Sequence, residues 1–332
     1  MNKRCRMMVN LLFLVSMSLV CFIPIQAASD QYFSIAGASV GTTAYQWAAG
    51  IADVVGKTIP GIKATAEETN GYVENLRLFL NGNVEAGFSH AGLAHQAYLG
   101  EGAFKGTPKG RILGWMSMPP MIIHVYTLDG SKISSIKDLA GKRVGVGQIG
   151  GSPYFDLGIL LETAKLKGKI KGFEVKIAEQ SSMLSDGQLD VGMWSGSPPI
   201  PSIMELCVTK KVKFIPISDA LIKSISKKYP FFYKKDLPAN SYPGQTAPVQ
   251  SFAVQVAGLL RADVPEDVAY KATKAIFENI ENLKKVHSGF NQVTKEKVLE
   301  GMTIPLHPGV LRYYREIKVP GIEEYVAKTK RL

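Results

Sequence analysis

The sequence predicts an α/β protein of two lobes with a cleft between them. Three observations support this prediction. A pattern of strand, glycine turn and helix occurs twice, strands and helices alternate along the chain, and two long apolar strands are flanked by proline. Alternation of strands and helices is typical of α/β folds with largely parallel sheets, and 332 residues suffice for two such lobes.

The repeated pattern predicts two helix N-termini that face glycine turns. In the first copy the strand is 32–36, the turn is 37–43 and the helix is 44–55. In the second copy the strand is 143–146, the turn is 147–152 and the helix is 154–164. The first N–H groups of a helix lack intrahelical partners and carry partial positive charge, so such a turn favours an anion. Two turns of this kind predict a ligand held between them.

The remaining elements follow from apolar runs and helical spacing. Short apolar runs predict strands over 62–67, 86–89, 112–118, 121–127, 173–178, 190–194, 212–217 and 250–260. Helical spacing predicts helices over 71–81, 91–99, 182–186, 200–208, 219–229, 264–286, 294–300 and 310–316. Ser135 is a plausible helix cap before 136–139.

The proline-flanked strands near 116–126 and 246–258 are where the chain is expected to cross between lobes. One lobe would then consist of 29–118 plus 250–332, and the other of 119–249. The cleft would lie between them.

The first 28 residues predict a signal peptide. A basic start at residues 3–6 precedes the apolar run 7–25, and Gln26-Ala27-Ala28 supplies the small residues of a cleavage site near Ala27/Ala28. A retained membrane anchor is the alternative. A lipoprotein through Cys21 is disfavoured because Val20 stands where a small residue is expected. We expect a soluble, exported, periplasmic protein.

The positions of the cysteines and the net charge restrict the class of protein further. Cys5 and Cys21 lie in the leader, so Cys207 remains alone in an apolar stretch and is expected to pack in the core. The formal charge of +11 includes three leader residues, which leaves about +8. The lysines are dispersed and lack interleaved aromatic residues, so this charge predicts a solvated surface and argues against nucleic-acid binding.

Two glycine motifs have enzymatic alternatives. Residues 145–150 match G-x-G-x-x-G, but the acid expected about 20 residues later is missing, which disfavours a dinucleotide cofactor. Residues 37–41 match G-x-S-x-G, so a secreted serine esterase using Ser39 is an alternative, with His287 or His307 as base. The first predicted strand has no predecessor to supply an oxyanion N–H, which disfavours the esterase.

The histidines do not predict a metal site. His90 and His95 are five residues apart and do not share a helical face as metal ligands do. His124 lies in an apolar strand and is expected to be a satisfied core residue. No cofactor and no metal are predicted.

Binding is therefore the favoured function. We expect backbone N–H groups and the hydroxyls of Ser39, Thr42, Thr43 and Ser152 to hold carboxylate oxygens. The candidate ligand-binding residues from the turns and strand ends are Gly37, Ser39, Thr42, Thr43, Glu67, Asn70, Ser89, His90, Gln148, Gly150, Gly151, Ser152, Trp194 and Ser195. The alternative is that these glycines merely permit tight turns and that the strand-end residues are ordinary caps or core residues.

Across its mature length the sequence resembles the TAXI family of extracytoplasmic solute-binding proteins, which serve TRAP transporters. The order and spacing of several short segments carry the resemblance. These segments are 37–43, 65–67, 71, 73–75, 96–98, 136–144, 229–231, 242–245 and 305–309.

The resemblance implies a type II periplasmic-binding-protein fold whose lobes close over a small organic anion. Glutamate, a related amino acid, or a dicarboxylate such as 2-oxoglutarate is typical of the family. It also implies a monomer, no catalytic residues, and a TRAP permease as partner, with small and large subunits or the two fused. A sensor subunit that contacts a membrane receptor is an alternative.

The family pattern falls on Gly37–Thr43 with Tyr45 close behind, on Glu67, and on Gly147–Ser152. The sequence departs from it at Glu68, Tyr72, 88–90 and 46–47, which surround the expected pocket. Ligand identity is therefore the open point. A glutamate at 67 or 68 that faced the cleft would favour an amino acid, and its absence would favour a keto acid or dicarboxylate.

Overall fold

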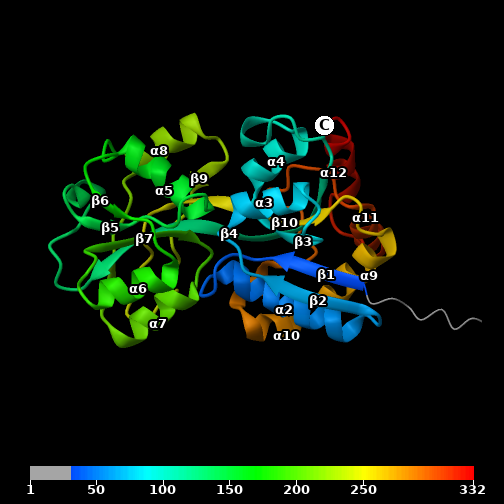
Figure 1. Cartoon of the computed structure of the whole chain (residues 1–332), viewed down its shortest axis with the longest axis horizontal. Coiled ribbons are helices and arrows are strands. Elements are labelled where there is room, and N and C mark those ends of the chain that lie inside the picture. The colour runs from blue at the N-terminus through cyan, green and yellow to red at the C-terminus, as the bar shows by residue number, and fades with distance from the viewer. Residues whose placement is uncertain (1–30) are drawn as a thin grey trace, which may run out of the picture. The chain divides into compact units, whose positions relative to one another are not determined.

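The computed structural model describes residues 31–332, and these residues form one compact unit (Figure 1). The predicted signal peptide lies outside the described residues. No helix within the described part of the chain is long and apolar enough to cross a membrane.

Ten strands of the described residues form one mixed sheet in the order β2-β1-β3-β10-β4-β7-β5-β6, with β8 paired to β4 and β9 paired to β10. The strands are β1 Gln31–Ala36, β2 Ile62–Glu67, β3 Ala86–His90, β4 Ile112–Leu128, β5 Arg143–Gly145, β6 Lys171–Phe173, β7 Val191–Gly196, β8 Val212–Phe214, β9 Phe232–Lys234 and β10 Phe252–Arg261. The predicted α/β class is confirmed.

Helices cover both faces of this sheet (Figure 1). They are α2 Thr43–Thr58, α3 Tyr72–Leu80, α4 Ala91–Leu99, α5 Ser152–Thr163, α6 Ile177–Ser185, α7 Pro201–Thr209, α8 Asp219–Lys228, α9 Glu266–Glu278, α10 Ile280–Val286, α11 Pro308–Glu316 and α12 Ile322–Thr329. In Figure 1, α2 and α10 lie below the sheet and α3 and α4 above it, while α6 and α7 lie opposite α5 and α8 at the other end.

The sheet contains two parallel groups joined by an antiparallel centre. Strands β2, β1 and β3 are parallel, as are β6, β5 and β7. Between them β10 and β4 run antiparallel to each other. The first part of β4 pairs with β10, and its last part pairs with β7 and β8. The strands expected to cross between lobes therefore lie side by side in the middle of the sheet.

The predicted break at Pro119-Pro120 is wrong. Strand β4 runs through both prolines as one strand, and its pairing with β10 shifts register between Val254 and Val256. A β-bulge accommodates the two missing donors without ending the strand. The prolines thus mark an irregularity in a continuous strand.

Two other predicted elements are corrected. The expected strand 173–178 is only the end of β6 followed by the start of α6. Helix α6 buries Ile177, Gln180, Ser181 and Leu184 at helical spacing, and two of these four are polar, so hydrophobicity did not reveal the helix. Residues 294–300 form successive turns in place of the expected helix.

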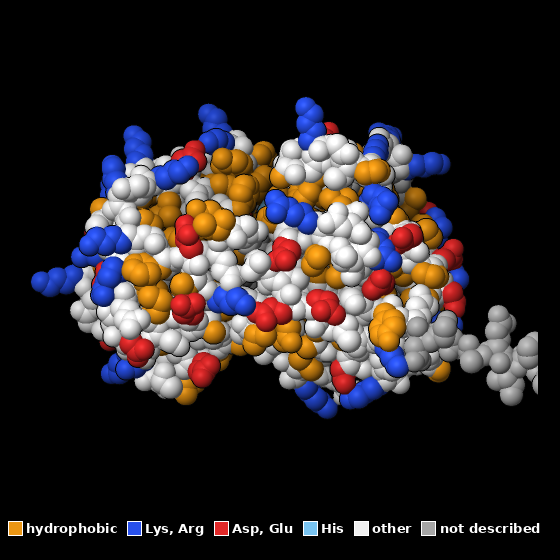
Figure 2. Space-filling model, in the orientation of Figure 1, with side chains coloured by type: hydrophobic (Ala, Val, Ile, Leu, Met, Phe, Trp, Pro, Cys, Tyr) orange, Lys and Arg blue, Asp and Glu red, His pale blue; other side chains and the backbone are white. Residues whose placement is uncertain are grey.

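Short strand β9 and helix α12 were not predicted, because one is three residues long and the other has few buried side chains. Cys207 is buried and packs in an apolar cluster, and His124 accepts or donates two hydrogen bonds inside the core. Both of these predictions are confirmed. On the face shown in Figure 2, Lys and Arg side chains are spread among acidic ones.

Candidate functional site

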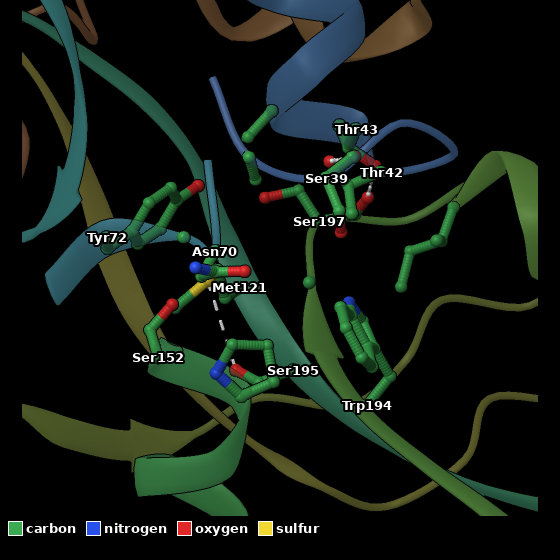
Figure 3. Close-up of a pocket in the computed structure, with 16 residues that line it drawn as sticks. Ser39, Thr42, Thr43, Asn70, Tyr72, Met121, Ser152, Trp194, Ser195 and Ser197 are labelled. Carbon is green, nitrogen blue, oxygen red and sulfur yellow. Dashed lines mark hydrogen bonds between the residues drawn. The ribbon is translucent and has the colours of Figure 1, made fainter. Parts of the chain in front are cut away.

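A small cavity of about 30 Å³ lies where the carboxyl ends of parallel strands meet the N-termini of two helices. Such strand ends are where open α/β sheets bind ligands. The lining residues are Ala38, Ser39, Thr42, Thr43, Ala44, Asn70, Gly71, Tyr72, Met121, Ser152, Pro153, Trp194, Ser195, Gly196, Ser197 and Ile200 (Figure 3). A cavity of this volume has room for about two water molecules.

The two glycine turns reach this same cavity, although they are far apart in sequence. Helix α2 begins at Thr43 beside the first turn, and α5 begins at Ser152 beside the second. The helix α5 cap, Gly151, has no side chain to occupy the first N–H groups of that helix. Two partial positive charges therefore border one cavity.

Seven of the fifteen candidate residues line the cavity: Ser39, Thr42, Thr43, Asn70, Ser152, Trp194 and Ser195. They come from the turn after β1, the loop after β2, the start of α5 and the end of β7. Figure 3 shows the Ser39 hydroxyl and the Asn70 amide turned toward the cavity.

The other eight do not line it: Gly37, Tyr45, Glu67, Ser89, His90, Gln148, Gly150 and Gly151. Gly37 packs under α2, where an added Cβ would lie 3.0 Å from the Tyr45 Cα. Ser89 and His90 are fully buried at the end of β3. Gly150 is exposed, and Gln148 is half-buried in the same loop.

Gly151 has a packing role at the cavity wall. Its φ is −82°, so no left-handed conformation requires glycine there. However, an added Cβ would lie 2.6 Å from the Asn70 carbonyl oxygen. Opposite it, Gly71 has φ +114°, which L side chains rarely adopt. These glycines let the loop after β2 contact the start of α5.

Two of the four hydroxyls expected to donate to a ligand are already committed. Thr42 Oγ1 donates to Ser39 O at 2.7 Å, and Thr43 Oγ1 donates to Ser197 O at 2.6 Å. Each hydroxyl has one proton, so these two offer only lone pairs to the cavity. Within residues 31–332, no hydrogen bond engages the hydroxyls of Ser39 and Ser152.

Asp156, which the sequence analysis missed, lies beneath the cavity and is fully buried. Ser195 Oγ, on the cavity wall, donates to Asp156 Oδ2 at 2.6 Å. Burial raises the pKa of Asp156 to about 7, and the Ser195 hydrogen bond partly opposes this shift. An aspartate on the inward side of an otherwise apolar helix, beside Leu157 and Leu160, was the available signal.

Neither Glu67 nor Glu68 lines the cavity. Glu67 Oε1 accepts a hydrogen bond from Thr65 Oγ1 at 2.8 Å, and Glu68 pairs with Lys176 at 2.7 Å. The Lys176 hydrogen bond lowers the pKa of Glu68. Two acids of the described residues contact residues of the cavity wall: Asp156 Oδ2 accepts from Ser195 Oγ, and Glu74 Oε2 accepts from Asn70 N at 2.6 Å.

Several contacts join residues 31–118 to residues 119–249 around the cavity. Besides Glu68–Lys176, they include the Thr43–Ser197 bond and a hydrogen bond from Ser202 Oγ to Gly41 O at 3.0 Å. An added Cβ on Gly41 would lie 2.4 Å from that same hydroxyl. Direct contacts between the two parts of the chain thus lie around the cavity.

The geometry does not support Ser39 as a nucleophile. No histidine of the described residues lines the cavity. His287 is held by Trp47 Nε1 and by Pro199 O, and His307 by Val264 O. A serine nucleophile needs a base within hydrogen-bond reach, and neither candidate base supplies one. Within residues 31–332, no group of His, Cys, Asp and Glu is arranged to hold a metal ion.

These features define an α/β protein whose mixed sheet places a small cavity at the N-termini of two helices. The model of the NMT1-like family matches residues 35–317. The chain belongs to the NMT1-like family.

Solved structures resemble it more distantly. One is a structure on glutathione import via GshT and the cystine ABC importer TcyBC of Streptococcus mutans (16% identity, 79% of this chain and 95% of that one, TM-score 0.47). Another is the periplasmic aliphatic sulphonate binding protein SsuA of Escherichia coli (16% identity, covering 92% of this chain and 80% of that one, TM-score 0.41). A third is the alkanesulfonate-binding protein SsuA of Xanthomonas axonopodis pv. citri bound to MOPS (16% identity, covering 91% of this chain and 86% of that one, TM-score 0.44).

Proposed function

We propose that this protein is an exported solute-binding protein that captures a small organic solute carrying a carboxylate and delivers it to a membrane permease. The observation that carries the proposal is the meeting of two helix N-termini at one small cavity lined by several hydroxyl groups. Peptide N–H groups at such ends bind anions without an arginine. Membership of the NMT1-like family and the binding proteins among the similar structures support this function.

Ligand entry requires the cavity to open. A volume of about 30 Å³ holds water but not a molecule of amino-acid size. We propose that residues 29–118 with 250–332 move as one lobe against residues 119–249. Strand β4 and the chain just before β10 then serve as the hinge, because the chain passes from one part to the other there. A ligand favours closure only through contacts that it makes in the closed state.

A thermal-shift panel on refolded, ligand-stripped protein tests the binding function. Amino acids, keto acids, dicarboxylates and sulfonates are compared, and a ligand at 100 times its Kd should stabilise the protein by about 2.7 kcal/mol. The double variant Ser39→Ala with Ser152→Ala should lose most of that shift. Ser182→Ala removes an exposed hydroxyl of α6 and should behave as wild type. The absence of a shift with every small anion contradicts the proposal.

For the transporter itself, we propose a TRAP permease of the TAXI type, on the sequence resemblance. One of the similar structures concerns an ABC importer, and ABC importers use ATP, so the energy source of transport is the test. Uptake by proteoliposomes containing the permease and this protein should follow an imposed sodium gradient and should not require ATP. ATP-dependent uptake that ignores the gradient would contradict the TRAP assignment and leave the binding function intact.

A further inference from the structure

A cluster of buried polar groups lies behind the cavity wall, and the anion-binding function does not use it. Asp156 and His90 are fully buried. Asp156 Oδ1 and His90 Nε2 have no hydrogen-bond partner within the described residues. Buried polar atoms without partners are rare and point to a functional or ligand-dependent role.

The neighbours of His90 fix its protonation. Its Nδ1 accepts a hydrogen bond from Leu93 N at 3.2 Å, so the neutral ring carries its proton on Nε2. That N–H lies 4.0 Å from Asp156 Oδ1. The ring stacks between Phe155 and Phe231, and burial lowers its pKa to about 3. His90 is therefore neutral and places no positive charge beside the carboxylate.

The Ser195 hydroxyl connects this cluster to the cavity. It lines the cavity and donates its only proton to Asp156, so its lone pairs are what remain for a ligand. Thr43 has likewise committed its proton to Ser197 O. The cavity therefore has a donor region at the starts of α2 and α5, with Ser39 and Ser152, and an acceptor region at Ser195 backed by a carboxylate.

We propose that the Ser195–Asp156 pair is the subsite for the ligand's ammonium group, and that the ligand is a zwitterionic amino acid. This inference rests on the proposed binding function. The carboxylate would lie at the helix N-termini, and the ammonium would donate to Ser195 Oγ with Asp156 as the buried counter-charge. Glu67 and Glu68 cannot take this role, because they are engaged away from the cavity.

The pair also predicts how binding responds to pH. When Asp156 takes up a proton, it can donate to Ser195 Oγ, and the serine proton then turns toward the cavity as a donor. That state repels an ammonium group. The titratable groups that face Asp156 are His90 from β3 and Tyr72 from α3, whose pKa values are respectively lowered and raised by burial. Both stay neutral between pH 5.5 and 8.5, so Asp156 alone changes charge there.

Calorimetric titration with matched ligand pairs tests the subsite. Each amino acid is compared with its 2-keto acid, for example L-glutamate with 2-oxoglutarate and L-alanine with pyruvate. At pH 8.5 the amino acid of the bound pair should bind at least ten-fold more tightly, and this preference should shrink at pH 5.5. Asp156→Asn should remove both the preference and its pH dependence.

Two further variants complete the experiment. Asp190→Asn changes an aspartate that pairs with Arg143 away from the cavity, and it should keep the wild-type preference. Ser195→Ala should lose the preference and provides a second reading if Asp156→Asn fails to fold. Equal or tighter binding of the keto acid by the wild type overturns the subsite but not the binding function. Failure of every amino acid and keto acid to bind contradicts the binding function itself.

Discussion

At the scale of single residues, the cavity is organised by which hydroxyls have already donated their protons. Thr42, Thr43 and Ser195 look alike in sequence as possible donors, yet each gives its proton to a protein acceptor. Of these three bonds, the one from Ser195 ends on a buried carboxylate, that of Asp156. Asp156 is therefore expected to affect the stability of the ligand-free protein and, under the proposed subsite, its ligand preference.

Asp156 makes stability depend on pH in a predictable direction. Burial raises its pKa from 3.8 to about 7, so the folded state binds a proton more tightly than the unfolded state. The resulting stability is fully present below about pH 4 and is lost as pH rises through about 7. Relative to Asp156→Asn, the ligand-free wild type should lose about 2–3 kcal/mol between pH 5 and pH 8.

Urea denaturation of both proteins at the two pH values measures this difference. Asp190 provides a control of opposite sign, because its hydrogen bond with Arg143 lowers its pKa. Its stabilisation is present above the unfolded pKa and is lost as pH falls. A gap between wild type and Asp156→Asn that stays constant from pH 5 to pH 8 would show that Asp156 is not the titrating group.

At the scale of elements, the second glycine turn serves contact as well as binding. Gly151 allows the Asn70 carbonyl to approach the start of α5, which brings the loop after β2 into the cavity wall. Gly151 fits the alternative that the turn glycines permit tight packing. Ser152 lines the cavity, whereas Gly151 does not.

Gly151→Ala should therefore separate two elements without straining the backbone. The added methyl would lie 2.6 Å from the Asn70 carbonyl oxygen, and such crowding costs about 1–3 kcal/mol of stability. Ligand affinity should fall with it. Gly158→Ala lies in the same helix with open space around the new methyl, and it should stabilise by about 0.5–1 kcal/mol. Thermal or urea unfolding of Gly151→Ala and Gly158→Ala measures the two changes in stability. Equal changes would refute the packing role of Gly151.

At the scale of the whole molecule, the proposed closure would depend on a few contacts across the cavity. The Glu68–Lys176 pair is about half exposed and is expected to contribute little. The buried bond from Thr43 Oγ1 to Ser197 O lies at the cavity itself. Its loss leaves a carbonyl unsatisfied when the protein is closed but solvated when it is open.

Thr43→Val should therefore shift the protein toward the open form. A net hydrogen bond is worth about 1 kcal/mol, so ligand affinity should fall roughly five-fold. The radius of gyration of the ligand-free protein, measured by small-angle X-ray scattering, should increase. Thr163→Val removes a similar hydroxyl–carbonyl bond within α5 and should change neither quantity. Wild-type affinity in Thr43→Val would exclude this bond as a closure contact.

Local sequence pattern was sufficient for most elements. Apolar runs and glycine turns located both strand–turn–helix units, and the structure adds Thr42 as the cap of α2. Local sequence pattern failed where tertiary contacts overruled the local preference. Pairing with β10 keeps β4 continuous through two prolines, and α6 buries polar side chains that hide its amphipathic face.

What the sequence determined by itself is the α/β class, the two helix N-termini and the residues that follow the strands. These depend on spacing along the chain, which is visible in one dimension. Only the tertiary structure decided that both turns border one cavity, that Glu67 and Glu68 are engaged elsewhere, and that Asp156 lies beneath Ser195. The reason is physical: a hydroxyl's role and a carboxylate's pKa depend on the neighbours and burial that folding supplies from distant segments.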